Sequence, residues 1–273
     1  MPVQQQDRTT FEQDWQAWHE ATQARLAAPH GFLAITALHW LTPTPQRFEG
    51  VPGQWSTSEE GVVVDLGDHE ELALDGQPLA GRHGFGVLPE RGGVLAAYGE
   101  VELEIARRGG HDILRPRHPD HRLRAGFTGT PTFAPDPAWQ VAGRYRAHDV
   151  PRPTTVGAVV DGLEHVYDAP GEIEVELAGT VHTLVAFEGA SPGALFVLFT
   201  DETSGTTTYA ACRALDVDRP GPDGSVVLDL NRARNLPCAY TDLATCPLPP
   251  RGNHLSVAVE AGDRIPFERR SPR

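Results

Sequence analysis

The chain has 273 residues and a formal net charge of −14, with 23 basic side chains against 37 acidic ones, and none of the basic side chains is a lysine. The acidic balance excludes nucleic-acid binding and attachment to an anionic membrane as the main function, because both need a basic surface. The absence of lysine excludes Schiff-base chemistry and a phosphate-binding loop that depends on lysine.

The N-terminus carries no recognisable targeting signal. Residues 1–15 (MPVQQQDRTTFEQDW) lack the basic stretch followed by an apolar stretch that a secretory signal has. No apolar run along the chain reaches the roughly 20 residues that a membrane-spanning helix needs. We therefore expect a cytoplasmic protein that does not enter a membrane.

The first predicted element is a helix over residues 10–28. Phe11 and Trp15 begin a series of apolar residues at offsets of three and four, which is typical of an amphipathic helix. Pro29 ends the pattern, because proline cannot continue a helix. We assign residues 1–47 to this helix and a lead-in segment.

Short β-like runs follow, separated by glycine, proline and aspartate, and they predict a small antiparallel β unit over residues 48–118. A Pro- and Gly-rich connection is expected over 119–155. At its start, His118 and His121 belong to the string HPDH, which we interpret as a solvated loop because no helix aligns the two imidazoles for a metal. We predict no metal site in the chain.

The second half predicts a β-barrel or sandwich over residues 156–265. Seven short apolar runs recur there at close spacing, which is typical of antiparallel β architectures. Glu172, Glu174 and Glu176 alternate with apolar residues, which indicates a strand with one solvated face. The predicted fold class is therefore mainly β, an antiparallel barrel or sandwich preceded by an amphipathic helix.

Polar side chains gather in residues 194–263. The string ALFVLFTDETSGTTTYAACRAL predicts a hairpin with Asp201 at its turn. Period-two alternation in its second strand would place Thr207, Tyr209 and Arg213 on one face. If the next strand pairs in register, Asp229 would meet Arg213 or Tyr209, and an Arg–carboxylate pair at a barrel mouth would anchor a polar ligand.

The loop that follows adds further candidates for ligand contact. Asn231 and Asn235 offer amide donors and acceptors, and four prolines stiffen the segment. Cys238 and Cys246 are eight residues apart, a spacing that allows a disulfide, while a reducing cytosol favours thiols. The sequence leaves open whether they are thiols, a disulfide or metal ligands.

These strings resemble the domain-of-unknown-function family 1684. The family's motifs D-x-T-x-G-x-x-T-Y-x-x-x-R, D-F-N-x-A-x-N-P-P-C-A and C-P-L-P-P-x-x-N fall on Asp201, Thr203, Gly205, Thr208, Tyr209, Arg213, Asp229, Asn231, Asn235, Pro237, Cys238, Cys246 and Asn253. Leu230 replaces the usual Phe, and Leu236 replaces the first Pro of the Pro-Pro pair. The resemblance spans nearly the whole chain and is densest over 150–263, and it implies no particular reaction or cofactor.

Two functions remain open. The first is a small-molecule enzyme, with a hydrolase as first candidate, in which Arg213 holds an anionic group and Asp229 or Tyr209 handles a proton. The alternative is a non-catalytic ligand-binding or scaffold protein whose polar cluster only supports the loop 231–250. In both, the expected partner is a small molecule, and the cofactor is unknown.

Overall fold

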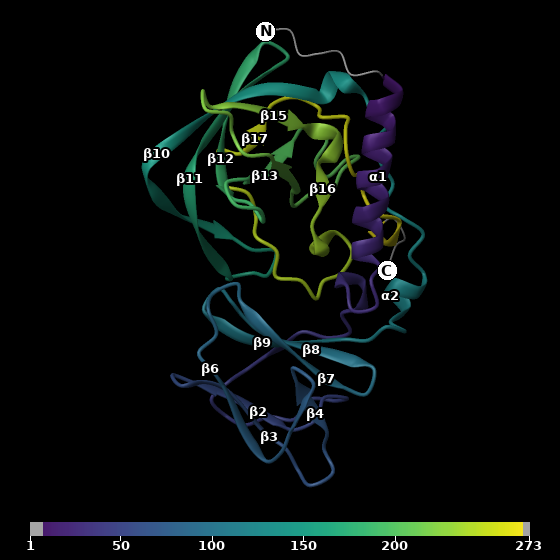
Figure 1. Cartoon of the computed structure of the whole chain (residues 1–273), viewed down its shortest axis with the longest axis vertical. Coiled ribbons are helices and arrows are strands. Elements are labelled where there is room, and N and C mark those ends of the chain that lie inside the picture. Colours follow the sequence, from purple (N-terminus) through teal and green to yellow (C-terminus); the bar gives the residue numbers. More distant parts are fainter. Residues whose placement is uncertain (1–7, 270–273) are drawn as a thin grey trace. The chain divides into compact units, whose positions relative to one another are not determined.

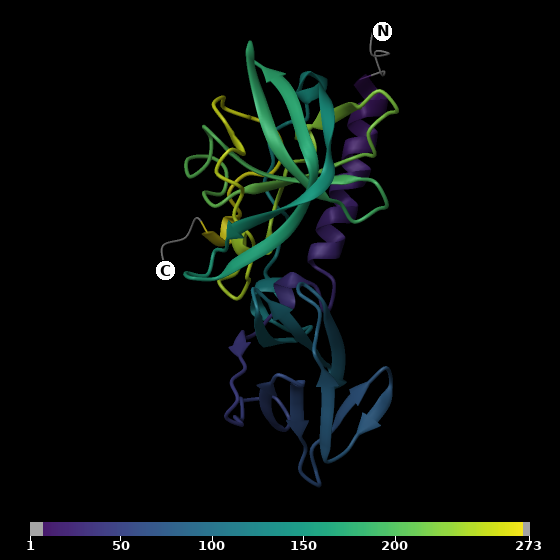
Figure 2. The ribbon, with the colours of Figure 1, turned by 90° about the vertical axis from the view of Figure 1, so that its left-hand side faces the viewer.

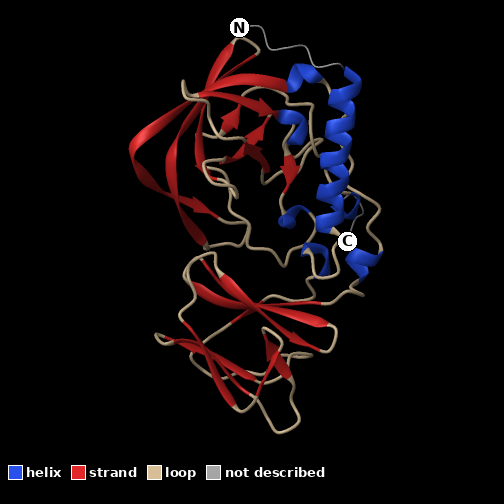
Figure 3. Cartoon of the chain, in the orientation of Figure 1, coloured by secondary structure: helices blue, strands red, loops and turns tan. Residues whose placement is uncertain are grey.

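The structure of the chain is a computed structural model that describes residues 8–269 and divides into two compact units. Unit 1 combines residues up to 24 with residues from 128 on, and unit 2 covers 25–127. Both consist mainly of strands (Figure 3), and the prediction of a mainly antiparallel β fold with an N-terminal helix is confirmed. The four segments expected from composition stay a prediction. Residues 1–7, which include part of the stretch searched for a signal, lie outside the described residues.

Unit 2 contains an antiparallel six-stranded sheet in the order β1-β9-β8-β7-β4-β5 and an antiparallel three-stranded sheet in the order β2-β3-β6. Trp55 of the smaller sheet and Ile105 of the larger one are fully buried in one shared core. The elements of this unit are η1 (Phe32–Ala34), β1 (His39–Trp40), β2 (Gln54–Ser58), β3 (Gly61–Asp65), β4 (Leu72–Leu74), β5 (Gln77–Leu79), β6 (Arg82–Gly86), β7 (Gly93–Tyr98), β8 (Val101–Arg108), β9 (His111–Arg117) and α2 (Arg122–Ala125).

Unit 1 is a single curled sheet in the order β15-β10-β11-β12-β13-β14-β16, with β17 added beside β13. Strands β14 and β15 also approach each other, so the sheet forms a half-barrel around an apolar core (Figure 1). The elements of this unit are α1 (Arg8–Leu26), η2 (Pro137–Trp139), β10 (Gln140–Gly157), β11 (Glu164–Leu177), β12 (Thr180–Glu188), β13 (Leu195–Asp201), β14 (Arg213–Val217), β15 (Ser225–Asp229), η3 (Leu230–Arg232), β16 (Arg234–Asn235), η4 (Pro237–Ala239), β17 (His254–Leu255) and η5 (Phe267–Arg269).

Strand β11 shows why the sheet curls around a core. Its residues alternate between buried and more exposed positions along the whole strand, as the glutamate pattern predicts. The buried positions include Ile173 and Val175, and each such side chain contributes about 1.5–3 kcal/mol when it leaves water. On the other face, Glu174 lies directly opposite Arg144 and forms an ion pair with Arg146, which keeps that face solvated.

Helix α1 closes the side of the half-barrel that the long strands β10 and β11 leave open (Figure 2). The helix covers Arg8–Leu26, close to the predicted 10–28, and Phe11 and Trp15 are its buried residues. The indole N–H of Trp15 donates to the carbonyl oxygen of Asn231 at 3.0 Å. No helix among residues 8–269 is long and apolar enough to cross a membrane.

Strand β10 differs from the sequence expectation, because most of it lies in the stretch that composition assigned to a connection. It runs over Gln140–Gly157 and includes Pro151 and Pro153. The ladder with β11 shifts register between Ala147 and Arg152, so Pro151 lies at an irregularity, and Pro153, opposite Asp168, lies just beyond it in a part of β10 that has no ladder partner on its other side. Proline is tolerated at such positions because no ladder hydrogen bond has to be donated there.

Candidate functional site

Strands β13 and β14 form the predicted hairpin, and Asp201 and Arg213 occupy its ends next to the turn. The two strands pair antiparallel, with Phe199 opposite Arg213. Arg213 Nη2 donates to Asp201 Oδ2 at 2.6 Å, and the two side chains are 1% and 0% exposed. An Arg–Asp pair therefore exists in this module, but the partner of Arg213 is Asp201 rather than Asp229.

The remaining contacts of Arg213 are also made within the protein. Its Nη1 donates to the carbonyl oxygen of Ala261, and its Nη2 donates to that of Val259 at 3.1 Å. Its Nε has no hydrogen-bond partner among the described residues, and the guanidinium lies over the Phe199 ring at 5.3 Å. Burial lowers the pKa of Arg213, and the charge of Asp201 opposes this shift. Arg213 thus ties the segment 259–261 to the hairpin.

Residues 202–212 form a compact loop, so the predicted alternation of Thr207, Tyr209 and Arg213 on one strand face is wrong. Asp201 Oδ1 accepts hydrogen bonds from the backbone N–H and the hydroxyl of Thr203, at 2.7 and 2.5 Å. The backbone N–H groups of residues 206–208 all donate to the carbonyl oxygen of Thr203. These local bonds replace the ladder that a longer hairpin would need, because aspartate and threonine side chains compete with sheet hydrogen bonds.

Two asparagines fasten the irregular C-terminal segment. Asn253 donates to the carbonyl oxygens of Val185 and Leu198, and its side-chain oxygen accepts from the N–H of Val185. The backbone N–H of Asn235 donates to Asp263 at 2.8 Å. Burial raises the pKa of Asp263 to about 7, although the Asn235 hydrogen bond and the Arg213 charge oppose it.

Asp229 and Asn231 belong to a separate cluster. Asp229 Oδ1 accepts from the backbone and the side-chain amide of Asn231, and its Oδ2 accepts from Gln140 at 3.2 Å. Asn231 also bridges to both backbone groups of Asp136. The expectation that Asp229 meets Arg213 or Tyr209 is therefore wrong, because β15 pairs with β10 and not with β14.

Tyr209 and Cys238 lie in a third place, an apolar cluster that also contains Cys212 and Cys246. All three cysteines are thiols rather than disulfides. Burial, together with the neighbouring Cys238, raises the pKa of Tyr209 to about 12, and a hydrogen bond with Cys246 raises the pKa of Cys238. Such thiols stay protonated and are poor nucleophiles. No group of three metal-ligating side chains is assembled within residues 8–269.

The predicted site residues thus fall into three places, and most of them are buried. Asp201, Arg213, Asn231, Asn235 and Cys238 are all less than 9% exposed. Thr207 Oγ1 and Asn235 Oδ1 are buried without a hydrogen-bond partner in the described part of the chain. None of the predicted residues lines the cavity at the opposite end of the hairpin. Of these residues, Arg213 and Asn235 hold the segment 259–263 against the hairpin.

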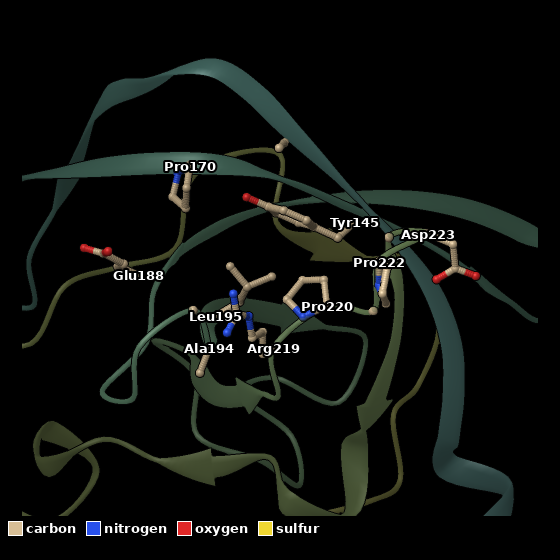
Figure 4. Close-up of a pocket in the computed structure, with 13 residues that line it drawn as sticks. Tyr145, Pro170, Glu188, Ala194, Leu195, Arg219, Pro220, Pro222 and Asp223 are labelled. Carbon is tan, nitrogen blue, oxygen red and sulfur yellow. The ribbon is translucent and has the colours of Figure 1, made fainter.

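An open cavity of about 510 Å³ lies at that opposite end (Figure 4). It is lined by Tyr145 and Ala147 of β10, Pro170 of β11, Glu188 of β12 and the loop segments 193–195 and 219–224. Six residue steps of about 3.3 Å separate Asp201 from Leu195, so the cavity is roughly 20 Å from the Asp201–Arg213 pair. This end of the half-barrel is its mouth, and we call the space the mouth cavity.

Two glycines shape the mouth cavity. A Cβ on Gly171 would come within 2.5 Å of the Tyr145 ring and within 2.3 Å of the carbonyl oxygen of Arg146, so the ring can approach β11 this closely only because that position is glycine. A Cβ on Gly193, whose φ is +79°, would approach the Arg219 side chain at 3.2 Å. The aromatic ring and the guanidinium are therefore both supported by bare backbone.

Three polar side chains of the mouth cavity have no partner among residues 8–269. The side chains of Tyr145, Glu188 and Arg219 make no hydrogen bond or ion pair with another residue of 8–269, and Arg219 and Glu188 do not pair with each other. Figure 4 shows the Tyr145 hydroxyl and the Arg219 guanidinium in the same space. Burial raises the pKa of Tyr145, so its hydroxyl stays protonated and can donate.

Residue types alone do not predict the mouth cavity. Its signal in the sequence is the string RPGPDG at 219–224, a stiff turn between two strands that begins with an arginine. Asp223 is occupied within that turn, because it accepts the N–H of Ser225, and hydrogen bonds with Ser225 lower its pKa. Arg219, in contrast, is exposed and has no partner in the described part of the chain.

The fold and the site define a mainly β protein. One end of its half-barrel is closed by buried hydrogen bonds, and the other end holds the open mouth cavity. Comparison with known protein families identifies the family of the chain. The family described as "Protein of unknown function (DUF1684)" matches residues 125–264, and the chain belongs to this family. The match covers every strand of the half-barrel.

Among solved structures, the chain is similar to an uncharacterized protein of Haloarcula marismortui determined by solution NMR. The two are 34% identical, the match covers 53% of this chain and 80% of that chain, and the TM-score is 0.45. The search of curated proteins finds no match.

Proposed function

We propose that this chain is a non-catalytic binding protein for a small zwitterion with an apolar body, such as a free amino acid, and that the ligand occupies the mouth cavity. One observation carries the proposal: Arg219 and Glu188 line the same cavity with opposite charges and have no partner among the described residues. A cation and an anion held apart in one cavity complement a ligand that carries both charges.

The walls of the cavity support an apolar ligand body. The Tyr145 ring, Leu195 and three prolines supply flat apolar surface, while the polar groups are few. Binding sites for small molecules have this composition, with polar groups that fix orientation inside an apolar lining. Proline rings also lose little conformational entropy when a ligand packs on them.

Catalysis by the residues predicted from sequence is not favoured by this geometry. Arg213 gives its Nη donors to protein acceptors, and Tyr209 and Asp229 do not reach it. The residues that line the mouth cavity include no serine, histidine or cysteine, and so they supply neither a strong nucleophile nor an imidazole base. The catalytic role of Tyr209, Arg213 and Asp229 stays a prediction.

A hydrolase keeps one supporting observation elsewhere in unit 1. Thr200 Oγ1 lies 3.1 Å from His254 Nδ1, and His254 Nε2 lies 3.3 Å from Glu202. A carboxylate can only accept, so Nε2 carries a proton, and in the neutral imidazole Nδ1 accepts from the threonine hydroxyl, as in a nucleophile–base pair. Thr200→Val should abolish any hydrolysis of p-nitrophenyl acetate, with Thr180→Val as control. Equal activity in both variants removes this candidate.

Three matched probes test the binding function: L-phenylalanine, 3-phenylpropionate, which lacks the amine, and phenethylamine, which lacks the carboxylate. Calorimetric titration should show the tightest binding for L-phenylalanine. Each truncated probe should bind about tenfold more weakly, because it loses one charge-assisted hydrogen bond. Equal affinity for all three would contradict a zwitterion site.

Two variants assign the charges. Arg219→Gln should weaken L-phenylalanine and 3-phenylpropionate but leave phenethylamine unchanged. Glu188→Gln should weaken L-phenylalanine and phenethylamine but leave 3-phenylpropionate unchanged. Arg251→Gln, an exposed arginine outside the cavity, is the control and should change none of the three affinities. A loss that is the same for every probe would contradict the assignment.

A further inference from the structure

A second cavity lies within unit 2 and is independent of the mouth cavity. Its volume is about 590 Å³, and it is bounded by residues 36–39, the strand ends at Tyr98 and Val101, and the HPDH turn at residues 118–121. Those two histidines were expected in a solvated loop. They are partly buried instead, and each is held by a hydrogen bond within unit 2.

The hydrogen bonds fix the tautomers of these two rings in opposite ways. His118 Nδ1 accepts the backbone N–H of Asp120 at 3.0 Å, so a neutral His118 carries its proton on Nε2. His121 Nδ1 lies 2.9 Å from the carbonyl oxygen of Leu33, which can only accept, so a neutral His121 carries its proton on Nδ1 and its Nε2 is an acceptor. The turn therefore offers one imidazole donor and one imidazole acceptor.

Other side chains around the cavity add further hydrogen-bond donors and acceptors. The Tyr98 phenol is half-buried, and burial raises its pKa to about 12, so it keeps its proton. Arg122 adds donors, and the exposed carboxylates of Glu49 and Asp120 add acceptors. The Nε2 atom of His39 is buried and has no hydrogen-bond partner among the described residues. None of these side-chain groups is tied up by an ion pair within unit 2.

The charges of the side chains around this cavity limit which ligands it can bind. With neutral imidazoles, one arginine faces two carboxylates, which disfavours an anionic ligand. Metal binding is also disfavoured, because the imidazoles and carboxylates of residues 8–269 do not come together as a ligand set. Ala37, Val101 and Pro116 supply apolar surface between the polar groups.

We infer that this cavity, which we call the HPDH cavity, binds a neutral saccharide. Sugar hydroxyls both donate and accept, so they can satisfy the alternating donors and acceptors of His118, His121 and Tyr98, while the C–H faces of the ring pack on Pro116 and Val101. The observation behind this inference is the pair of opposite, structurally fixed tautomers at one turn. It does not depend on the ligand of the mouth cavity.

Asparagine variants test the inference with little disturbance of the turn. In His118→Asn, the amide oxygen can replace Nδ1 as acceptor for Asp120, and in His121→Asn the amide N–H can replace Nδ1 as donor to Leu33. Both variants lose the Nε2 atom. His69→Asn, at an exposed histidine of the same unit outside the cavity, is the matched control.

Saturation-transfer NMR on the intact chain, with D-glucose, D-galactose and maltose as probes, gives the readout. We expect transfer to at least one sugar, unchanged in His69→Asn and weakened roughly fivefold in each HPDH variant, as for the loss of one neutral hydrogen bond. Transfer to none of the three sugars would overturn the inference. So would equal transfer in all variants, or displacement of the sugar by millimolar phosphate or spermidine.

The melting temperature of each variant separates binding from folding. Both HPDH variants should melt within a few degrees of His69→Asn. If either unfolds, Tyr98→Phe replaces it, because this change removes only a hydroxyl and should give the same loss of transfer. A sugar that binds Tyr98→Phe as well as it binds the unchanged protein counts against the site.

Discussion

Arg213 and Arg219 stand six positions apart at the two ends of β14, and their surroundings are opposite. Arg213 is 1% exposed and bound to Asp201 and to carbonyl oxygens from the segment 259–261. Arg219 is exposed, lies over the backbone of Gly193 and has no partner among the described residues. The first arginine belongs to the most recognisable motif of the chain, and the second belongs to no motif.

The contrast between the two arginines shows which polar residues are available to a ligand. A buried charge must be paired within the protein, since an unpaired one is too costly, and so a motif rich in buried charges can be retained for folding alone. A charge at an open cavity has no such need and remains available to a ligand.

Arg213→Met should lower the free energy of unfolding by about 3–5 kcal/mol, because Asp201 would be left as an unpaired buried carboxylate. Urea unfolding followed by circular dichroism measures it. Arg219→Met is the matched control and should change stability by less than about 0.5 kcal/mol. Similar losses in the two variants would remove the distinction between the ends of β14.

Asp263 should make the stability of the folded chain depend on pH. Its pKa rises from 3.8 to about 7 in the folded chain, so the folded state binds more protons than the unfolded state between these values. The contribution of Asp263 to the free energy of unfolding is therefore complete below about pH 4. It is lost as the pH rises through 7, by on the order of 4 kcal/mol. In Asp263→Asn, which keeps an acceptor for Asn235, this part of the pH dependence should vanish. An unchanged slope between pH 5 and pH 8 would contradict the account.

Asn253→Ala should lower the free energy of unfolding by about 2–3 kcal/mol. The variant leaves the backbone groups of Val185 and the carbonyl oxygen of Leu198 without partners in the interior. Thermal unfolding measures the loss, and Gln54→Ala, at an exposed residue, is the control. An effect no larger than that of the control would show that Asn253 does not hold its segment.

Glu188→Gln should have the smallest effect on folding, within about 0.5 kcal/mol, because its carboxylate has no partner to lose in the described part of the chain. The same unfolding experiment checks it. A loss above about 1 kcal/mol would show that the mouth cavity is part of the structural network after all.

The periodic parts of the fold could be predicted from the sequence. Helix α1 follows from the spacing of Phe11 and Trp15, and β11 follows from its alternating glutamates, because both patterns report directly which face is buried. Strand β10 was not found, because its prolines indicate a loop unless the irregularity in the ladder is known.

The pairing of the polar residues could not be predicted. Asp201 looks like an ordinary turn residue, and only its bond to Thr203 and the resulting loop bring it to Arg213. The order of strands in the sheet determines which residues Asp229 contacts, since β15 pairs with β10, which lies far from it in the sequence. The mouth cavity is built from five separate segments, and no local pattern records that they meet.

Mapping the residues that contact a ligand tests directly whether the ligand occupies the mouth cavity. L-phenylalanine is titrated into the isotope-labelled protein, and the backbone amide shifts are followed by NMR. The account predicts shifts at residues 193–195 and 219–224, with little change at residues 201–208 and 259–263. Shifts concentrated at the Asp201–Arg213 end, with the mouth cavity unaffected, would contradict it.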